Sequence, residues 1–252
     1  MSQKKEFKIL DPEGLETLNV VAEAERFNHW MYQTISPYCN GKILEIGSGI
    51  GNISKYFLNN NQEMSLSDIR QNYIDILGEQ FATRSNLNAI LKMDIVASDF
   101  DIMYAHYFKQ FDCIYALNVI EHVENDSMAI ANCKKLLKTG GKLIILVPAY
   151  QRLYNNFDKE LEHYRRYSLK QLDLLMLENE LTIIHHQHFN FVGILGWWLN
   201  GSLLKKKIIP SGQMKLYNSL VPVFKIVDKC IFNTMGLNVI SVGQKNKHYG
   251  IK

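Results

Sequence analysis

One stretch near the start of the chain, residues 42–53, most constrains the fold. It reads KILEIGSGIGNI: a short apolar run that carries one acid, Glu45, leads into three glycines at alternate positions, Gly47, Gly49 and Gly51. A helical pattern follows at once. This order predicts a buried strand, a tight turn and a helix N-terminus. Glycine leaves room for a ligand and the helix end offers free N–H groups, so we expect a nucleotide-like cofactor here.

The composition fits a globular protein without an obvious macromolecular partner. The 252 residues include 47% hydrophobic and 21% charged residues, and the net charge of +3 gives no reason to expect nucleic acid. The four cysteines form no CxxC pair, so we expect reduced thiols. We find no secretory leader and no apolar run of the roughly 20 residues that a spanning helix needs, and we predict a cytoplasmic protein, monomer or homodimer.

Strand and helix patterns alternate through the middle of the chain. Strands are predicted at 43–46, 64–67, 89–93, 111–117, 142–147, 181–191 and 238–242, and helices at 15–35, 52–58, 72–81, 125–138, 168–179, 193–207 and 213–232. The alternation predicts an α/β fold, a doubly wound and mostly parallel sheet with helices on both faces. We expect a single domain, residues 1–252, with an N-terminal helical arm (1–40), a cofactor-binding core (41–190), and a C-terminal helical cap with the last strand (191–252).

Acidic residues follow the second and third strands. Asp68 lies 21 residues after Gly47, where a carboxylate can grip a ribose diol, although it could also cap the next helix. Asp94 could accept the amine of an adenine whose ring lies between Met93 and Ile95, or it could only cap its loop. Both acids are at carboxyl ends of strands, where open α/β sheets bind ligands.

The glycine spacing selects among cofactors. A dinucleotide turn reads G-x-G-x-x-G, whereas this one reads G-x-G-x-G after Glu45. Together with Asp68, Asp94 and the sequence NVIEH at 118–122, residues 41–150 resemble the class I S-adenosylmethionine-dependent methyltransferase superfamily. Its Rossmann-like fold implies a seven-stranded sheet.

A second resemblance is narrower. The segments RFNHWMY at 26–32 and HYRRYS at 163–168 are similar to a bacterial methyltransferase subgroup whose loop reads G-H-x-R-R-Y-[ST], with Glu162 here in place of the glycine.

The resemblance implies roles for named residues. The glycine turn would admit the methionine and ribose parts of S-adenosyl-L-methionine, Glu45 would order the turn or the amino group, Asp68 would hold the ribose, and Asn118 and its neighbour Val119 would line the pocket near the sulfonium. The full set implied to bind the cofactor is Glu45, Gly47, Ser48, Gly49, Gly51, Asp68, Ile69, Met93, Asp94, Ile95, Asn118 and Val119.

Methyl transfer is an in-line displacement that depends on alignment of the acceptor. For a hydroxyl acceptor of a small molecule, His122 and His163 are the candidate catalytic bases, although each also has an ordinary structural interpretation. Residues of the loop at 149–168 are candidate contacts of the acceptor, or the arginines pair with Asp158 or Glu162 instead. The candidates in that loop are Tyr150, Tyr154, His163, Arg165 and Arg166.

Several features remain open in the sequence. The sequence favours a packing role for Trp30 and Tyr32, although these residues could also cover a cofactor. For the histidines at 185, 186 and 188 it favours an ordinary strand over a zinc site, so no metal is assigned. The tail, with tryptophans at 197–198 and lysines at 205–207, favours a cap over the acceptor site but could contact a membrane and a lipid-linked or glycan acceptor. An NAD(P)-dependent oxidoreductase and a non-catalytic cofactor-binding protein are the alternative functions.

Overall fold

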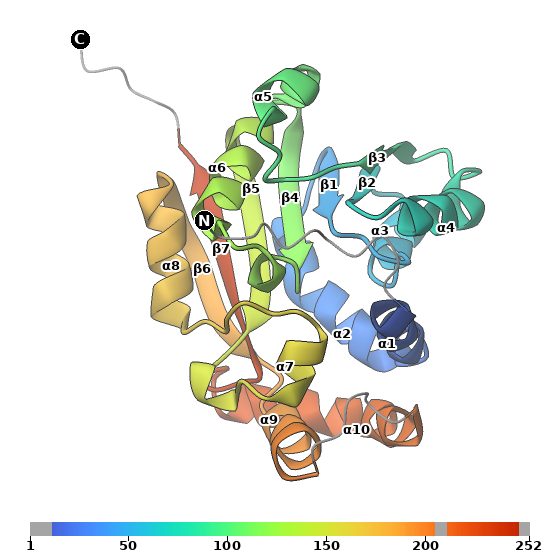
Figure 1. Cartoon of the computed structure of the whole chain (residues 1–252), viewed down its shortest axis with the longest axis vertical. Helices are drawn as coiled ribbons and strands as arrows, with labels where there is room; N and C mark the ends of the chain where they lie inside the picture. Colours follow the sequence, from blue (N-terminus) through green and yellow to red (C-terminus); the bar gives the residue numbers. More distant parts are fainter. Residues whose placement is uncertain (1–11, 205–210, 247–252) are drawn as a thin grey trace, which may run out of the picture.

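A computed structural model describes residues 12–204 and 211–246 and contains one seven-stranded sheet (Figure 1). The strand order is β3-β2-β1-β4-β5-β7-β6, and β7 is antiparallel to both of its neighbours while the other pairs are parallel. The strands are β1 (Ile43–Ile46), β2 (Met64–Asp68), β3 (Leu87–Lys92), β4 (Phe111–Leu117), β5 (Leu137–Pro148), β6 (Leu181–Phe189) and β7 (Asn238–Lys245). The predicted mostly parallel seven-stranded sheet is confirmed.

Helices cover both faces of the sheet, as a doubly wound fold requires. The α-helices are α1 (Pro12–Ala22), α2 (Glu25–Ile35), α3 (Ser54–Asn59), α4 (Gln71–Phe81), α5 (Phe100–Met103), α6 (Asp126–Leu136), α7 (Asn156–Glu160), α8 (Leu169–Glu178), α9 (Gly193–Trp197) and α10 (Ser211–Cys230). One apolar cluster packs α5, α6 and α8 on one face, and a second packs α2, α3, α4 and α10 on the other. The central strand β4 is buried along most of its length because it contributes to both clusters.

Short helical turns occupy the connections. They are η1 (Ser36–Tyr38), η2 (Ala105–Tyr107), η3 (Ile120–His122), η4 (Gln151–Leu153) and the π-helical stretch η5 (Trp198–Leu203). The turn η3 directly follows the carboxyl end of β4, and η4 and α7 lie within the polar loop that follows β5. These two connections carry all the candidate catalytic and acceptor-binding residues.

The N- and C-terminal helices gather beyond one end of the sheet. In Figure 1, α1, α7, α9 and α10 lie beyond the end at which β1 and β4 terminate. The side chain of Asn218 on α10 accepts hydrogen bonds from the backbone N–H groups of Arg26 and Phe27 on α2. The rings of Phe157 on α7 and Trp197 on α9 lie 5.1 Å apart. The tail is therefore packed on the parts of the chain that carry the loop after β5.

Some predicted boundaries are wrong. The helix expected to reach residue 138 ends at Leu136, and β5 begins at Leu137 rather than at Lys142. Leu137 is fully buried and pairs with Phe111 at the start of β4, so burial extends the strand through the glycines that predict a stop. Residues 1–11 of the N-terminal helical arm expected at 1–40 lie outside the described residues, and α1 begins at Pro12.

No helix in the described ranges, 12–204 and 211–246, is long and apolar enough to cross a membrane.

All four cysteines are free thiols.

Candidate active site

The glycine turn is held against β2 by backbone hydrogen bonds. The N–H of Ser48 donates to the carbonyl of Ser67 at 2.8 Å, and the N–H of Gly49 donates to the Asp68 carboxylate at 3.0 Å. Gly47 has a φ of +69°, and a Cβ there would lie 2.4 Å from Cγ2 of Val119. A side chain at Gly47 is thus excluded by both conformation and space. The space beside Gly47 is thus filled by Val119, which fixes the turn against the end of β4.

Glu45 is buried inside β1 directly beneath the turn. Its carboxylate accepts a hydrogen bond from the Ser54 hydroxyl at the start of α3, and its backbone carbonyl accepts one from Ser67 Oγ at 2.8 Å. Burial raises the pKa of Glu45 to about 7, although the hydroxyl of Ser54 opposes the shift. Of the two roles implied for Glu45, ordering the turn is the one that these contacts favour.

The raised pKa of Glu45 makes a prediction about stability. The folded protein binds this proton more tightly than the unfolded chain does. The free energy of unfolding therefore falls as the pH rises from 4.5 to about 7. Glu45→Gln removes this loss of stability. Relative to wild type, the variant should gain up to about 3 kcal/mol across this window and then level off, as measured by urea unfolding at each pH. Glu63→Gln, on the exposed segment before β2, is the control and should show no such gain. A constant offset between Glu45→Gln and wild type would contradict the shift.

Asp68 and Asp94 both bond to backbone N–H groups at the ends of their strands. The Asp68 oxygens accept from Gly49 and, at 2.9 Å, from Arg70 at the start of α4. Asp94 accepts from Val96 at 2.9 Å, the capping contact that the sequence offers as its alternative. Each carboxylate oxygen has a further lone pair, so these bonds leave acceptor capacity for a ribose or an amine.

The side chains around Asp94 divide between core and site. Met93 and Ile95 are buried in the apolar cluster beneath the sheet edge, whereas Ile69 and Asp94 remain partly exposed. This geometry favours core packing over direct adenine contact for Met93 and Ile95.

The helix α1 lies over the glycine turn. A Cβ on Gly49 would lie 3.0 Å from Cδ1 of Leu18, and the Asn52 amide donates to the Leu18 carbonyl at 3.0 Å. Trp30 on α2 is buried against Phe189, with ring centroids 4.4 Å apart. Trp30 thus has the packing role that the sequence favours, and the helix that covers the turn is α1.

The carboxyl end of β4 turns sharply at Asn118. Its φ of +54° is unusual for a residue other than glycine, and its N–H donates to the carbonyl of Leu146 at 2.8 Å. The side chain is exposed, and its oxygen accepts a hydrogen bond from Asn238 at 3.2 Å. Val119 follows and packs on Gly47, so this strained corner adjoins the cofactor turn.

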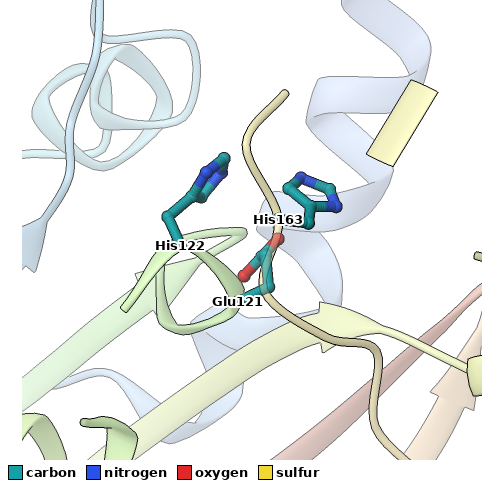
Figure 2. A group of neighbouring side chains, drawn as sticks. All are labelled: Glu121, His122 and His163. Carbon is teal, nitrogen blue, oxygen red and sulfur yellow. The ribbon is translucent and has the colours of Figure 1, made fainter. Parts of the chain in front are cut away.

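Three side chains converge just beyond this corner (Figure 2). Glu121 and His122 come from η3 and His163 from the loop after α7, and their potential ligand atoms all lie within 4.8 Å of one another. The two imidazole rings meet edge to face with centroids 4.6 Å apart. The loop is fixed there because the N–H of Tyr164 donates to the Glu121 carbonyl at 2.8 Å. The two predicted catalytic histidines are therefore neighbours in the structure.

Burial shifts the pKa values of two side chains in this cluster. Glu121 is fully buried and neither carboxylate oxygen has a hydrogen-bond partner, and burial raises its pKa to about 8. Burial, followed by the nearby charges of His163 and Arg70, lowers the pKa of the partly exposed His122 to about 3. His122 is therefore neutral at physiological pH and a weak base.

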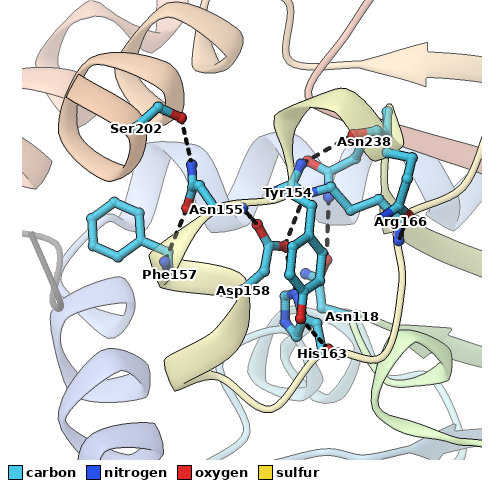
Figure 3. Close-up of polar contacts among 11 residues, drawn as sticks. Asn118, Tyr154, Asn155, Phe157, Asp158, His163, Arg166, Ser202 and Asn238 are labelled. Atoms are coloured by element: carbon cyan, nitrogen blue, oxygen red, sulfur yellow. Dashed lines mark hydrogen bonds and ion pairs between the residues drawn. The ribbon is translucent and has the colours of Figure 1, made fainter. Parts of the chain in front are cut away.

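Asp158 is the hub of the loop after β5 (Figure 3). Its carboxylate lies 2.8 Å from Nδ1 of His163 and accepts a hydrogen bond from Nε of Arg166 at 2.8 Å and from the Asn155 N–H at 2.9 Å. Burial alone would raise the pKa of Asp158, but the bonds from His163 and Arg166 outweigh it and lower the pKa. An ionised Asp158 can only accept, so it fixes the proton of His163 on Nδ1 and leaves Nε2 free.

The other residues predicted to contact the acceptor are placed differently. Arg166 is buried, bonds to Asp158 and to the Ala149 carbonyl, and lies 4.6 Å from the Trp197 ring. Its bonds match the predicted alternative, an ion pair with Asp158, and favour a positioning role over substrate contact. Arg165 instead pairs with Asp126 at 2.8 Å, a partner that the sequence did not suggest.

The two tyrosines border the same loop. The hydroxyl of Tyr154 donates to the His163 carbonyl at 2.8 Å, and the ring of Tyr150, which has a φ of +61°, stacks on His188 with centroids 5.6 Å apart. His186 bonds to Asp173 at 2.6 Å and His185 stacks on Tyr38. The strand histidines thus have ordinary partners, and in the part of the chain that the structure describes only the Glu121 cluster has metal-ligand spacing.

Comparison with known proteins identifies the family. A protein-family model described as a methyltransferase domain matches residues 33–186, more than half of the chain. The chain therefore belongs to the methyltransferase-domain family, and it shares the fold of a solved S-adenosylmethionine-dependent methyltransferase. The glycine turn and its acidic strand ends fit that cofactor, which has no phosphate, because the turn offers backbone and carboxylate groups without a lysine.

Individual relatives are distant. The polyketide synthase component of lovastatin nonaketide synthase from Aspergillus terreus is 28% identical over 150 residues, which is 56% of this chain but 5% of that protein. The chain spans a similarly small part, 5%, of the highly reducing polyketide synthase rstn3 from Aspergillus nomiae, at 27% identity over 128 residues, or 46% of this chain. These relatives are fungal, so the expected bacterial subgroup is not confirmed.

Solved structures share the fold. A methyltransferase from Archaeoglobus fulgidus matches with a TM-score of 0.57 at 14% identity. The alignment covers 86% of this chain and 94% of the chain of that protein. Phosphoethanolamine N-methyltransferase 2 from Haemonchus contortus was solved with phosphomonomethylethanolamine and S-adenosylhomocysteine, and it matches with a TM-score of 0.61 at 17% identity. The alignment covers 95% of this chain and 60% of the chain of that protein. At such identities the likeness extends to the fold.

Glu121 and Asp158 lie beside the predicted histidines in the structure but are not among the residues that the sequence predicts for the site. Glu121 precedes the predicted His122, so an acid at a buried position of the turn after β4 was the available signal. Asp158 lies five residues before His163, a spacing that does not by itself bring the two side chains together because the loop has no fixed period.

Proposed function

We propose that this domain transfers the methyl group of S-adenosylmethionine to a hydroxyl oxygen of a small-molecule acceptor. The observation that carries the proposal is the position of His122 and His163, which lie together just beyond the corner where Val119 packs on Gly47 of the cofactor turn. An acceptor between the turn and these imidazoles would have a proton acceptor on one side and the sulfonium on the other. Alignment of this kind supplies most of the rate of a displacement.

His163 is the better placed of the two candidate bases. Asp158 orients its ring and fixes the proton on Nδ1, so Nε2 presents a lone pair. The hydroxyl proton would pass to Nε2, the oxygen would attack the methyl carbon, and the carbon–sulfur bond would break to leave S-adenosylhomocysteine. Tyr150 and Tyr154 would line the acceptor site, and Arg165 would lie at the outer edge of that site. Arg166 would position Asp158.

Incubation with methyl-labelled cofactor and cell extract, followed by identification of the labelled product, tests this reaction. His163→Gln should lower the rate of labelling by about 10²–10⁴-fold while calorimetry shows unchanged binding of S-adenosylhomocysteine. The exposed His106 on η2 provides the control, and His106→Gln should label at the wild-type rate. A product labelled on nitrogen or carbon, or full activity of His163→Gln, would contradict the proposed oxygen transfer.

A second candidate is a lipid-linked acceptor taken from a membrane surface, favoured by the C-terminal helices. Leu216, Leu220 and Val223 form an exposed row at helical spacing on α10. More apolar side chains are exposed on α9 and η5: Leu195, Trp198, Leu199 and Leu203. An apolar face of this kind matches an interfacial helix.

The charges beside this row suit an anionic surface. A groove of about 510 Å³ between α2 and α10 is lined by Arg26, His29, Lys225 and Lys229 together with apolar residues of α10. The single acid of α10, Asp228, is buried. Each basic side chain near an anionic membrane contributes about 1 kcal/mol. The lysines at 205–207, which also prompted this candidate, lie outside the described residues.

Vesicle flotation tests the membrane contact. The protein should float with vesicles of phosphatidylcholine and phosphatidylglycerol, should float less with phosphatidylcholine alone, and should detach as salt is raised. The double variant Leu216→Asp, Val223→Asp should stay in the soluble fraction. Ile102→Asp, at an even more exposed apolar position on α5, is the control and should float like wild type. Equal flotation of the double variant and wild type would exclude the α10 row as the contact.

A further inference from the structure

The buried carboxylate of Glu121 has no partner in a protein that otherwise pairs its buried acids. Glu121 is fully buried and both of its oxygens lack a hydrogen bond, whereas the other fully buried acid, Asp158, is bonded by three residues. A buried acid without a partner costs free energy unless it takes up a proton or a ligand compensates its charge. The carboxylate lies within 4.8 Å of ring nitrogens of His122 and His163, so the missing partner belongs between these three groups.

One histidine is already oriented as a ligand. The Nδ1 of His163 is held by Asp158 at 2.8 Å, and the ring of His122 meets the ring of His163 edge to face. In His163 one nitrogen is thereby fixed by a protein acceptor and the other remains available. This carboxylate–histidine arrangement is how proteins orient imidazoles that bind metal ions.

We propose that Glu121, His122 and His163 bind a divalent transition-metal ion. Two imidazoles and one carboxylate suit Zn²⁺, Mn²⁺, Fe²⁺ or Co²⁺, and three protein ligands leave positions open for another molecule. Ligand atoms around one such ion in tetrahedral geometry lie about 3.4 Å apart, so the atoms of this cluster, which lie within 4.8 Å of one another, would draw together by up to about 1.4 Å when the ion binds. His122 is partly exposed, which gives the ion a path from solvent.

The ion would deepen the proposed methyl transfer, and this consequence rests on that proposed function. In the loaded site Nε2 of His163 would bind the ion instead of taking the hydroxyl proton, and this replaces its role as the base in the metal-free reaction. At an open position the ion would bind the acceptor oxygen and lower the pKa of its hydroxyl, so that the proton would leave to solvent while the oxygen displaces S-adenosylhomocysteine from the methyl carbon. Acceptors that offer an oxygen able to bind the ion, such as phenols and hydroxy acids, form the substrate class of the loaded site.

Direct metal binding tests the site without any turnover. The untagged protein is titrated with Co²⁺ and followed by visible absorption, and Zn²⁺ binding is measured by calorimetry. We expect one ion per chain and a loss of affinity of at least about 100-fold in Glu121→Gln. Glu124→Gln, an exposed acid three residues away, is the matched control and should bind like wild type.

Two further variants keep the outcome decisive. His122→Asn removes a ligand at a partly exposed position and should also weaken binding at least about tenfold. If the wild type binds no ion, or if Glu121→Gln and His122→Asn bind as tightly as wild type, the proposal is overturned. It is equally overturned if binding is lost in His186→Asn instead, which would place the ion on β6. Because these readouts need no acceptor, failure of the metal site is separate from failure of the methyl transfer.

Discussion

Replacing Asp68 by alanine is expected to lower the affinity for S-adenosylhomocysteine by at least about 100-fold. A carboxylate that holds two ribose hydroxyls makes two charge-assisted hydrogen bonds, each contributing about 1.5–3 kcal/mol. The loss also frees the N–H of Gly49, so the turn itself loosens. Isothermal titration calorimetry measures the effect directly.

Two other substitutions make the Asp68 test specific. Asp68→Asn keeps an oxygen that can accept from Gly49 and should weaken binding less than alanine does. Asp75→Asn, an exposed acid on α4, should bind like wild type. If Asp68→Ala binds the cofactor product as tightly as wild type, Asp68 has only the helix-capping role that its bond to Arg70 represents.

Replacing Asp158 by asparagine is expected to cost about 3–5 kcal/mol of unfolding free energy. Asp158 is the only carboxylate that Arg166 contacts among the described residues, and both side chains are buried, so the substitution leaves an uncompensated charge. Chemical denaturation at neutral pH measures the loss. Glu180→Gln, which removes one partner of the exposed pair with Lys134, should cost at most about 1 kcal/mol.

The pH dependence of the Asp158 variant follows from the lowered pKa of the carboxyl. The stability that Asp158 contributes is fully present above its unfolded value of 3.8 and is lost as the pH falls through the lower folded value. The gap between wild type and Asp158→Asn should therefore be constant from neutral pH to about pH 5 and should narrow in stronger acid. A gap that stays constant into strong acid would contradict an ionised hub.

The sequence predicts the cofactor half of the site better than the acceptor half. The glycine turn, Asp68 and Asn118 are all placed by strand ends, and because the sheet is parallel their positions follow from the alternation of strand and helix alone. The same logic does not say that Met93 and Ile95, which adjoin Asp94, pack in the apolar cluster, so their contact with adenine stays a prediction. Periodicity cannot say which side of a strand end faces the ligand once the chain leaves the sheet.

The acceptor half depends on contacts between distant segments. Glu121 and His163 are brought together by a loop that follows another strand, and that loop is fixed by the buried pair of Asp158 and Arg166. Residue types in the sequence could identify His122 and His163 as candidate catalytic bases, but they could not show that the two rings are in contact. The two interpretations of Arg166 stay open in the sequence for the same reason, because only its burial beside Asp158 favours an ion pair over a contact with the acceptor.

The most direct test of the account is a crystal structure of the protein with S-adenosylhomocysteine. We predict that the ribose hydroxyls bond to Asp68, that the adenine lies beside Ile69 and Asp94, and that the sulfur faces the side of the site formed by Asn118, His122 and His163. A cofactor bound elsewhere, or in the glycine turn with its sulfur directed away from the two histidines, would contradict the proposed site of methyl transfer.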